Sequence, residues 1–353
     1  MRFSKVLLSI FLCLSIMCSS FAEWDPAFDH DRNGIIDIGD FAMLAAHWLE
    51  SEMVTVPEIS GLEQSQAEAA IISAGLTVGS VTEEHSSTVA EGLVISQSPL
   101  AGESIAVGSA VDFIISLGED PTGMTWVYID DPGVSGHEGF TGYMSKYETT
   151  NAQYCQYLNE ALASGDVQIS GGDVDGASGD YSGQIYYDMD DFEAQISYSN
   201  GSFYVETRDG YDMSDHPVVK VSWYGAKAFA AYYGYRLPTE WEWQAAADYD
   251  GSFAYGCGTS IDHSKANYDQ DNPLGLSDYP YTTPVGYYPV VGYFLCDMAG
   301  NVWEWTNSNS GSNRVLRGGS WFRYGSHCTV SYRGYNDPSN TGYDVGFRVV
   351  LAV

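Results

Sequence analysis

Apolar residues recur at two different spacings in the first third of the chain. Between Gln64 and Ala74 they fall three and four residues apart, which is the spacing of one helical face. From 109 to 116 they alternate with polar residues, as on a strand with one buried face, and residues 92–99 form a second strand-like run. The pattern predicts one helix packed on a small sheet within residues 53–119.

The pattern changes after Met124, where Tyr, Trp, Gly and Asp replace long periodic runs. Two helices are still predicted, at 151–162 and 222–233, and Gly234 ends the second. The N-cap of the first helix is expected at one of three neighbouring residues, Thr149, Thr150 or Asn151.

Residues 164–214, between these helices, are rich in Gly, Asp and Tyr. We expect them to form a surface insertion. Within it, Asn200–Gly201 predicts a two-residue turn of a hairpin at 196–205, because both positions of such a turn favour residues that accept a positive φ.

The first 22 residues fit a secretory signal peptide. Arg2 and Lys5 precede an apolar run, and small residues follow at the cleavage position. A membrane anchor is the alternative, but the apolar run is short for a span. A lipoprotein signal at Cys18 is a second alternative, and the residues before it fit a lipobox poorly. We therefore expect a secreted or extracytoplasmic protein, in the periplasm or at the cell surface, with no transmembrane segment after signal cleavage.

Composition narrows the class of protein further. The 353 residues exceed what one hydrophobic core usually holds, so at least two domains are expected. Aromatic residues make up 14% of the chain, which favours loops pinned by large rings over a helical bundle. The formal net charge of -33 repels nucleic acid and anionic membranes and attracts divalent cations. We therefore expect no nucleic-acid partner, and calcium as a cofactor.

Residues 23–52 contain the spacing of an EF-hand-like calcium loop, followed by an amphipathic helix at 41–49. Gly34 takes the turn, and the ligands are expected from six residues: Asp29, Asp31, Asn33, Ile35 through its carbonyl, Asp37 and Asp40. An Asp at the twelfth position resembles the dockerin repeat, which implies calcium binding and a possible cohesin-type partner. Dockerins carry two such loops and this chain shows one. The alternative is a solvated acidic turn.

Residues 53–119 resemble the PASTA repeat of cell-wall kinases and penicillin-binding proteins. The resemblance rests on the proline-glycine entry at 57–61, on A-G-L-T-V-G at 74–79 and on S-Q-S-P-L-A-G at 96–102. It implies a possible muropeptide contact. A rigid spacer is the alternative interpretation, since the repeat is single and has few basic residues.

Residues 120–353 carry a third set of motifs, among them R-L-P-T-E-W-E-W from Arg236, G-N-V-W-E-W from Gly300, R-G-G-S from Arg317 and G-F-R ending at Arg348. These resemble the signatures of the sulfatase-modifying factor family, whose founding members are the formylglycine-generating enzymes. The resemblance implies an α+β, C-type-lectin-like domain, low in regular secondary structure and stabilised by tryptophans, buried arginines and calcium.

Two calcium sites are implied by this resemblance. The first would use four groups: Asp297, the carbonyls of Gly300 and Val302, and Glu304. Carboxylates and backbone oxygens from one tight turn suit a hard cation. The alternative is a buried Glu–Arg network without metal. A second, more weakly supported site would use Asn267 and the carbonyl of Tyr268, with an acid near Asp278.

The family holds copper with two cysteines after the R-G-G-S motif and oxidises a substrate cysteine to formylglycine with dioxygen. The register from Arg317 places Arg323 at the first cysteine position and Cys328 at the second. A guanidinium has no lone pair for Cu(I), so Arg323 cannot replace a thiolate. Copper is therefore weakly supported, although three residues match catalytic positions of the family: Cys328, Ser320 and Trp303.

Four cysteines remain after the signal segment, namely Cys155, Cys257, Cys296 and Cys328. Three pairings are possible, and the sequence does not choose among them. Scattered histidines argue against the iron-dependent sulfoxide synthases of the family, and no G-x-S-x-G motif is present. Glu240 and Glu242 are expected to be structural partners of Arg236 or Arg348.

Together these features predict a secreted, calcium-binding modular protein. Its C-terminal domain is expected to bind an extracellular protein or a cell-wall or polysaccharide ligand, without copper oxidase activity. The alternative is an enzyme, either a formylglycine-generating oxidase that works with one thiolate or a related metal-dependent oxidoreductase. A third hypothesis places the chain in a cohesin-type or cell-wall assembly through its N-terminal modules.

Overall fold

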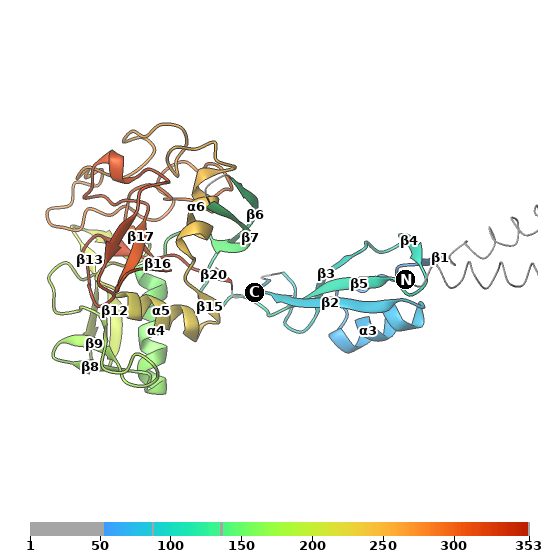
Figure 1. Ribbon diagram of the computed structural model, residues 1–353. Coiled ribbons are helices and arrows are strands. Elements are labelled where there is room, and N and C mark those ends of the chain that lie inside the picture. The colour runs from blue at the N-terminus through green and yellow to red at the C-terminus, as the bar shows by residue number, and fades with distance from the viewer. Residues whose placement is uncertain (1–52, 87, 135–136, 352–353) are drawn as a thin grey trace, which may run out of the picture. The chain divides into compact units, whose positions relative to one another are not determined.

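The computed structural model describes residues 53–86, 88–134 and 137–351. The chain divides into two compact units, Met1–Asp120 and Pro121–Val353 (Figure 1). The predicted signal peptide, the calcium loop Asp29–Asp40 and the helix after it lie outside the described residues. Within the described ranges, no helix is long and apolar enough to cross a membrane.

The first unit has one helix on a three-stranded sheet, as the sequence pattern predicts. Helix α3 (Gln64–Ser73) begins with a capping box between Glu63 and Gln66. The sheet has the order β2-β5-β3, with β2 parallel and β3 antiparallel to β5. The bounds are β2 Thr77–Glu84, β3 Val94–Ser98 and β5 Ala110–Ser116, and a separate pair joins β1 Met53–Thr55 to β4 Ser104–Ala106. Val111 and Phe113 of β5 face Ala67 and Ile71 of the helix in one buried cluster.

The second unit contains two four-stranded sheets. The first has the order β15-β20-β7-β6 and the second β18-β17-β16-β19. The strands of the first are β6 Trp126–Val134, β7 His137–Ser145, β15 Tyr235–Arg236 and β20 Val350–Leu351. Those of the second are β16 Trp303–Ser310, β17 Asn313–Arg317, β18 Gly334–Asn336 and β19 Val345–Gly346. Most strands are short, which leaves much of this unit in loops and confirms the predicted α+β class.

The described residues of the second unit include three α-helices. Helix α4 (Asn151–Ser164) has Thr150 as its N-cap, one of the three predicted residues. Helix α5 (Trp223–Tyr232) is capped by Ser222, and Gly234 follows it with φ +77°. Helix α6 (Glu240–Asp248) was not predicted, because its sequence E-W-E-W-Q-A-A-A-D has no clear apolar face. A capping box from Thr239 fixes the start of this helix, and the burial of Trp243 stabilises it against the core.

Residues 164–214 are more than a surface insertion. They form short antiparallel strands: β8 Val167–Ser170, β9 Asp173–Gly176, β10 Ile185–Tyr187, β11 Ile196–Ser199, β12 Ser202–Val205, β13 Thr207–Arg208 and β14 Tyr211–Asp212. The predicted hairpin is present, with its turn at Asn200 and Gly201 at φ +54° and +89°. However, Val174, Tyr187 and Ile196 are fully buried in the main core of the unit. Their burial explains why the segment is ordered despite its polar composition.

Candidate functional site

The loop between Cys296 and Val302 is built from left-handed backbone. Asp297, Gly300 and Asn301 have φ of +57°, +79° and +59°. A Cβ at Gly300 would lie 2.1 Å from the carbonyl oxygen of Asn267, so only glycine fits there. The amide of Asn301 donates to the same carbonyl at 2.8 Å. The fold therefore brings together the loop of the first predicted calcium site and Asn267 of the second.

One ion pair anchors this loop to the end of the chain. Arg348 donates from Nε and Nη2 to the two oxygens of Glu304, at 2.6 and 2.9 Å, and neither side chain is exposed. Trp243 Nε1 donates to Glu304 at 2.7 Å. Arg348 Nη2 also donates to the carbonyl of Cys296 at 2.9 Å. Both Glu304 oxygens are thus already hydrogen-bonded, as the interpretation without metal requires, and a calcium ion would have to share them.

Two further carboxylates lie beside this pair. Glu148, 1% exposed, accepts from Asn301 Nδ2 at 2.6 Å and from the Val302 amide at 3.1 Å. Asp297 accepts from the Gly286 amide at 2.6 Å. Burial raises the pKa of Glu148 well above its usual range, with Asp297 and Glu304 adding repulsion. Burial likewise raises the pKa of Asp297 to about 6.

Three carboxylates therefore share one guanidinium. We name Glu148, Asp297, Glu304 and Arg348 the carboxylate cluster. The excess negative charge can be relieved by protons or by a bound cation, because an uncompensated buried charge is costly. Carboxylate and carbonyl oxygens are the ligands that calcium prefers, so the chemistry of this donor set fits the ion. The three carboxylates do not by themselves converge within 4.8 Å, as Asp173, Asp188 and Asp190 do elsewhere in the described residues.

Asn267 provides a separate indication of a ligand. Its side chain is 0% exposed and donates to the Tyr281 carbonyl at 2.7 Å, but its Oδ1 has no hydrogen-bond partner among the described residues. A buried oxygen without a partner costs free energy unless a donor or a cation reaches it. The carbonyl of Tyr268, the other predicted ligand, accepts a hydrogen bond from the backbone amide of Asp271 at 3.0 Å. Asp278, near which the third ligand was expected, is exposed.

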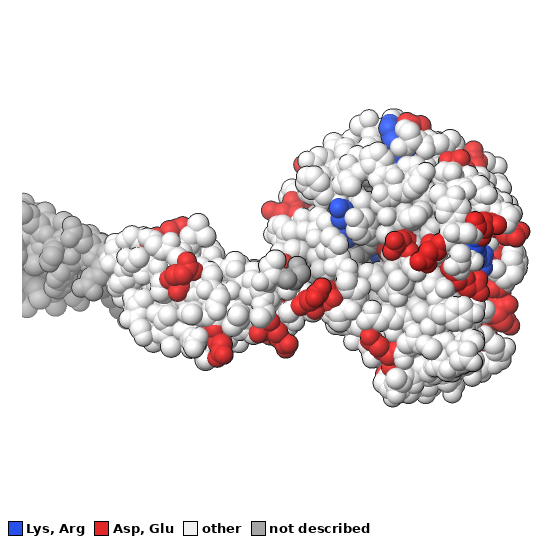
Figure 2. All heavy atoms as spheres, turned by 180° about the vertical axis from the view of Figure 1, so that it is seen from behind, with Lys and Arg blue, Asp and Glu red and all other residues white. Residues whose placement is uncertain are grey.

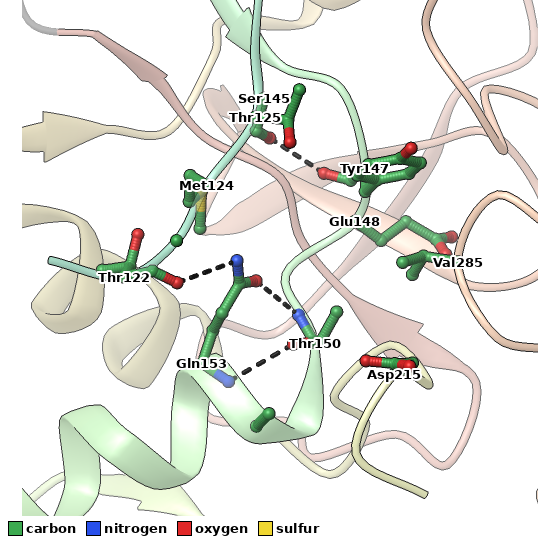
Figure 3. A pocket seen from close by; sticks show the side chains of 12 residues that line it. Thr122, Met124, Thr125, Ser145, Tyr147, Glu148, Thr150, Gln153, Asp215 and Val285 are labelled. Carbon is green, nitrogen blue, oxygen red and sulfur yellow. Dashed lines mark hydrogen bonds between the residues drawn. The ribbon is translucent and has the colours of Figure 1, made fainter. Parts of the chain in front are cut away.

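A cavity of about 310 Å³ opens beside the carboxylate cluster. Figure 3 shows Glu148 next to Val285 on one wall, with Gln153 and Thr150 at the start of helix α4 and Asp215 below. Most of the lining residues are polar, and Glu148 and Asp215 are the acidic ones. The cavity therefore gives a small cation or water a route toward Glu148.

The segment after Arg317 carries a second constellation. Ser320 Oγ donates to Asp344 Oδ2 at 2.8 Å, and Arg323 Nε lies 3.3 Å from the same oxygen. Ser320 and Asp344 are buried, whereas the Arg323 side chain is 45% exposed. Burial raises the pKa of Asp344, and Ser320 and Arg323 oppose this by stabilising its charge. Asp344 was missed from the sequence, where the only signal is an acid two residues before the G-F-R motif.

Cys328 is enclosed behind this segment. It is 0% exposed, and burial raises the pKa of its thiol to about 12. Gly319, at φ +78°, leaves room for it, since a Cβ there would lie 2.4 Å from Cys328 Sγ. Trp303 is 5% exposed and stacks obliquely on Tyr332 at 5.9 Å, and its amide donates to the Asp344 carbonyl at 2.8 Å. Of the three predicted catalytic residues, Ser320 is held by Asp344, while Cys328 and Trp303 pack as core.

Aromatic rings lie beside Arg323. Its guanidinium lies 5.5 Å from the ring centre of Phe322, which packs edge-on against Tyr343 at 5.4 Å. Tyr279 stacks on Tyr343 at 6.3 Å. We name Tyr279, Phe322, Arg323 and Tyr343 the Arg323 face. The amide of Trp321 donates to the carbonyl of Asn301 at 2.8 Å, so this face is tied to the loop of the carboxylate cluster.

The chain matches known families over both units. Residues 137–353 match the family described as "Sulfatase-modifying factor enzyme 1-like domain", and residues 54–117 match the PASTA domain. The first match spans more than half of the chain. The chain belongs to the sulfatase-modifying factor family.

Curated relatives of this family member include a serine/threonine-protein kinase pkn1 from Chlamydia caviae, 32% identical over 232 residues. That alignment covers 60% of this chain and 33% of the kinase. A formylglycine-generating enzyme from Thermomonospora curvata is 34% identical over 39% of this chain and 56% of the enzyme. The solved structure "Crystal Structure of CarF" aligns with a TM-score of 0.45 and 23% identity over 66% of this chain and 99% of that one. The chain spans about a third of the length of the first kinase relative.

The copper site of the sulfatase-modifying factor family does not fit the residues found here. The first ligand position holds Arg323, which is ion-paired with Asp344. The second holds Cys328, whose buried thiol resists ionisation. Cu(I) needs paired soft ligands, and a guanidinium offers none.

The predicted arginine partner is correct for Glu242 and wrong for Glu240. Glu242 pairs with Arg236 at 2.7 and 2.8 Å, as predicted. Glu240 instead pairs with Arg333 at 2.5 and 2.7 Å and with Arg317 at 3.3 Å. Arg348 is occupied by Glu304, because β16 and the end of the chain lie together in the core. Glu148 was also missed as a member of the cluster, since a single acid between Tyr147 and Thr149 gives no sign of burial.

Proposed function

We propose that the C-terminal domain has lost copper oxidase activity and acts as a calcium-supported binding module outside the cytoplasm. The observation that carries this proposal is the ion pair between Arg323 and Asp344 at the first copper position. A permanent cation there repels Cu(I) and offers it no ligand. Cys328 alone leaves half of a two-thiolate site.

The binding surface in this proposal is the Arg323 face. Phe322, Arg323 and Tyr343 combine rings with a charged donor, a combination enriched in interaction sites because it gives large contact areas and directed hydrogen bonds. Phe192 lies nearby and is 72% exposed. The Arg208 guanidinium joins this neighbourhood, donating to the carbonyls of Tyr279 and Phe192 at 2.9 and 2.7 Å.

The partner in this proposal is an extracellular protein or a cell-wall polysaccharide. The PASTA domain supports an extracytoplasmic location for the chain. The similarity of the chain to a protein named as a serine/threonine-protein kinase supports the same location. Figure 2 shows acidic side chains spread over the visible face of the second unit, with few basic ones among them. Such a surface disfavours nucleic acid and anionic membranes. A cohesin-type partner for the loop Asp29–Asp40 remains a separate proposal.

Calcium has a supporting role in this proposal. It would bind at Asp297 and Glu304 with the carbonyls of Gly300 and Val302, near Asn267, and in the loop Asp29–Asp40. The cation would offset the excess charge of the carboxylate cluster and fix the loop that ends at Val302. Through the bond from Trp321 to Asn301, this loop supports the Arg323 face.

An oxidation assay tests the loss of activity. The full chain is incubated with Cu(I), dioxygen and a sulfatase-type cysteine peptide, and formylglycine is measured by mass spectrometry. We expect no product above that of Cys328→Ser. Turnover that depends on Cys328 would favour the alternative, an oxidase that works with one thiolate.

A sedimentation assay tests the binding surface. The full chain is pelleted with purified peptidoglycan, and Tyr343→Ala is compared with Tyr128→Ala, which removes an aromatic ring that is 54% exposed on β6. We expect Tyr343→Ala to reduce the bound fraction and Tyr128→Ala to leave it unchanged. Equal binding by both variants would contradict the assignment of this face. No binding by the wild-type chain would leave an extracellular protein as the partner class.

A further inference from the structure

Two of the four cysteines in the second unit share one small cluster of side chains. Cys328 belongs to a buried cluster with Ala266 and Ala299, and Cys257 packs against this cluster together with Tyr255, Ile261 and Tyr268. The other two cysteines lie elsewhere. Cys155 is on helix α4 in the main core, and Cys296 is held at the carboxylate cluster through its carbonyl.

The backbone explains why Cys257 and Cys328 meet. Tyr255 and Thr329 form an antiparallel bridge, and the Val330 amide donates to the Ala254 carbonyl at 3.0 Å. Tyr255 and Gly258 exchange two hydrogen bonds of 2.9 Å, which makes a tight turn with Cys257 at its tip. Residues opposite each other in such a pair have Cα atoms roughly 5 Å apart. In this register Cys328, next to Thr329, lies opposite Gly256, the neighbour of Cys257 in the turn.

We infer that Cys257 and Cys328 form a disulfide under oxidising conditions. All four cysteines are free thiols in this structure. Of the three possible pairings, the one that joins Cys257 to Cys328 is supported by a shared cluster and a shared backbone bridge. The inference is independent of the proposed binding function.

The exposure of the two thiols sets the order of the reaction. Cys257 is partly exposed and Cys328 is 0% exposed. The Cys257 thiolate attacks a small disulfide such as glutathione disulfide and releases one thiol. The Cys328 thiolate then attacks Cys257 Sγ and releases the second thiol. Two protein thiols are oxidised, one small disulfide is reduced to two thiols, and two protons leave the protein.

The bond would link the turn at 255–258 to the segment that follows Ser320 and Arg323. It would also consume Cys328, the one thiol left at the family's copper positions. Burial raises the pKa of Cys257 to about 11 and that of Cys328 to about 12, so the reaction should be faster at pH 9 than at pH 7.

Mass mapping of the full chain tests the pairing. The protein is equilibrated with glutathione disulfide at pH 9, alkylated and digested without reduction. We expect one linked peptide pair that contains Cys257 and Cys328, with Cys155 and Cys296 recovered as thiols. The variant Cys155→Ser should keep this link, and Cys257→Ser should abolish it.

Two mapping results would overturn the inference: a link that involves Cys155 or Cys296, or glutathione retained on Cys257 while Cys328 stays a thiol. A melting experiment gives an independent check. Reductant should lower the melting temperature of the oxidised wild type and of Cys155→Ser by several degrees. It should leave Cys257→Ala and Cys328→Ser unchanged, and a reductant effect that persists in either variant would contradict the pairing.

Discussion

Arg348 and Glu304 form a bidentate ion pair, with N–O distances of 2.6 and 2.9 Å, in which neither side chain is exposed. The guanidinium joins the end of the chain to β16 and also holds the Cys296 carbonyl. It is the cation that faces Glu304, Glu148 and Asp297 among the described residues. The pair therefore carries much of the charge balance of the carboxylate cluster.

Replacing this cation should destabilise the fold strongly. Arg348→Met leaves Glu304 buried without its partner, which costs about 3–5 kcal/mol in comparable sites. The matched control is Arg236→Met, whose pair with Glu242 is partly exposed and should cost about 0–1 kcal/mol. Urea unfolding followed by tryptophan fluorescence measures both changes. Similar losses in the two variants would contradict the central role of Arg348.

Removing calcium should lower thermal stability. A ligand present at a hundredfold excess over its Kd stabilises by about 2.7 kcal/mol, or roughly 5–10 °C in melting temperature for a domain of this size. We expect EGTA to lower the melting temperature of the wild type by such an amount. The drop should shrink in Asp297→Asn if the C-terminal site binds the ion, and in Asp29→Asn if the N-terminal loop does. A melting curve that EGTA leaves unchanged would exclude both sites.

Gly300 should tolerate no side chain. Gly300→Ala would place a methyl group 2.1 Å from the Asn267 carbonyl and strain a φ of +79°. Gly311→Ala is the control, because its φ of +65° carries a similar strain but its surroundings are open. That strain alone costs about 1 kcal/mol. We expect Gly300→Ala to lose clearly more stability in urea and to lose its response to EGTA, whereas equal losses would show that the close packing is unimportant.

His216 should make the fold sensitive to acid. It is 1% exposed and contacts Thr282 Oγ1 at 2.8 Å, and burial lowers its pKa to about 4. Because the unfolded chain binds this proton more readily, stability present above about pH 6.5 is lost as the pH falls toward 4. The loss should be roughly 3 kcal/mol. The variant His216→Gln should flatten this part of the urea stability profile relative to the exposed control His263→Gln, and parallel profiles would refute the assignment.

Local patterns in the sequence were sufficient for several elements. The apolar spacing of Gln64–Ala74 and the alternation in β5 predicted the first unit, because both depend on one face that packs on a neighbour in sequence. The turn at Asn200–Gly201 followed from backbone preferences alone. The family motifs then predicted the α+β class of the second unit.

The remaining features depend on contacts between distant segments. Glu148 lies more than 150 residues from Asn301, to which it is hydrogen-bonded, and nothing in its local sequence indicates burial. The same holds for Asp344 beside Arg323 and for Cys257 beside Cys328. Helix α6 was missed because its capping box and one buried tryptophan replace a regular apolar face. The burial of residues 164–214 likewise follows from core positions that a polar composition conceals.

A Cu(I) titration of Arg323→Cys against the wild type tests the central claim most directly. The competition is run under reducing conditions without oxygen, with a chromogenic Cu(I) chelator, and Arg323→Ser serves as the control for loss of the ion pair with Asp344. This claim predicts that neither the wild type nor Arg323→Ser competes for the metal. It also predicts that Arg323→Cys binds one equivalent of Cu(I), and that adding Cys328→Ser to the Arg323→Cys chain abolishes this binding. Stoichiometric Cu(I) binding by the wild-type chain, dependent on Cys328, would contradict it.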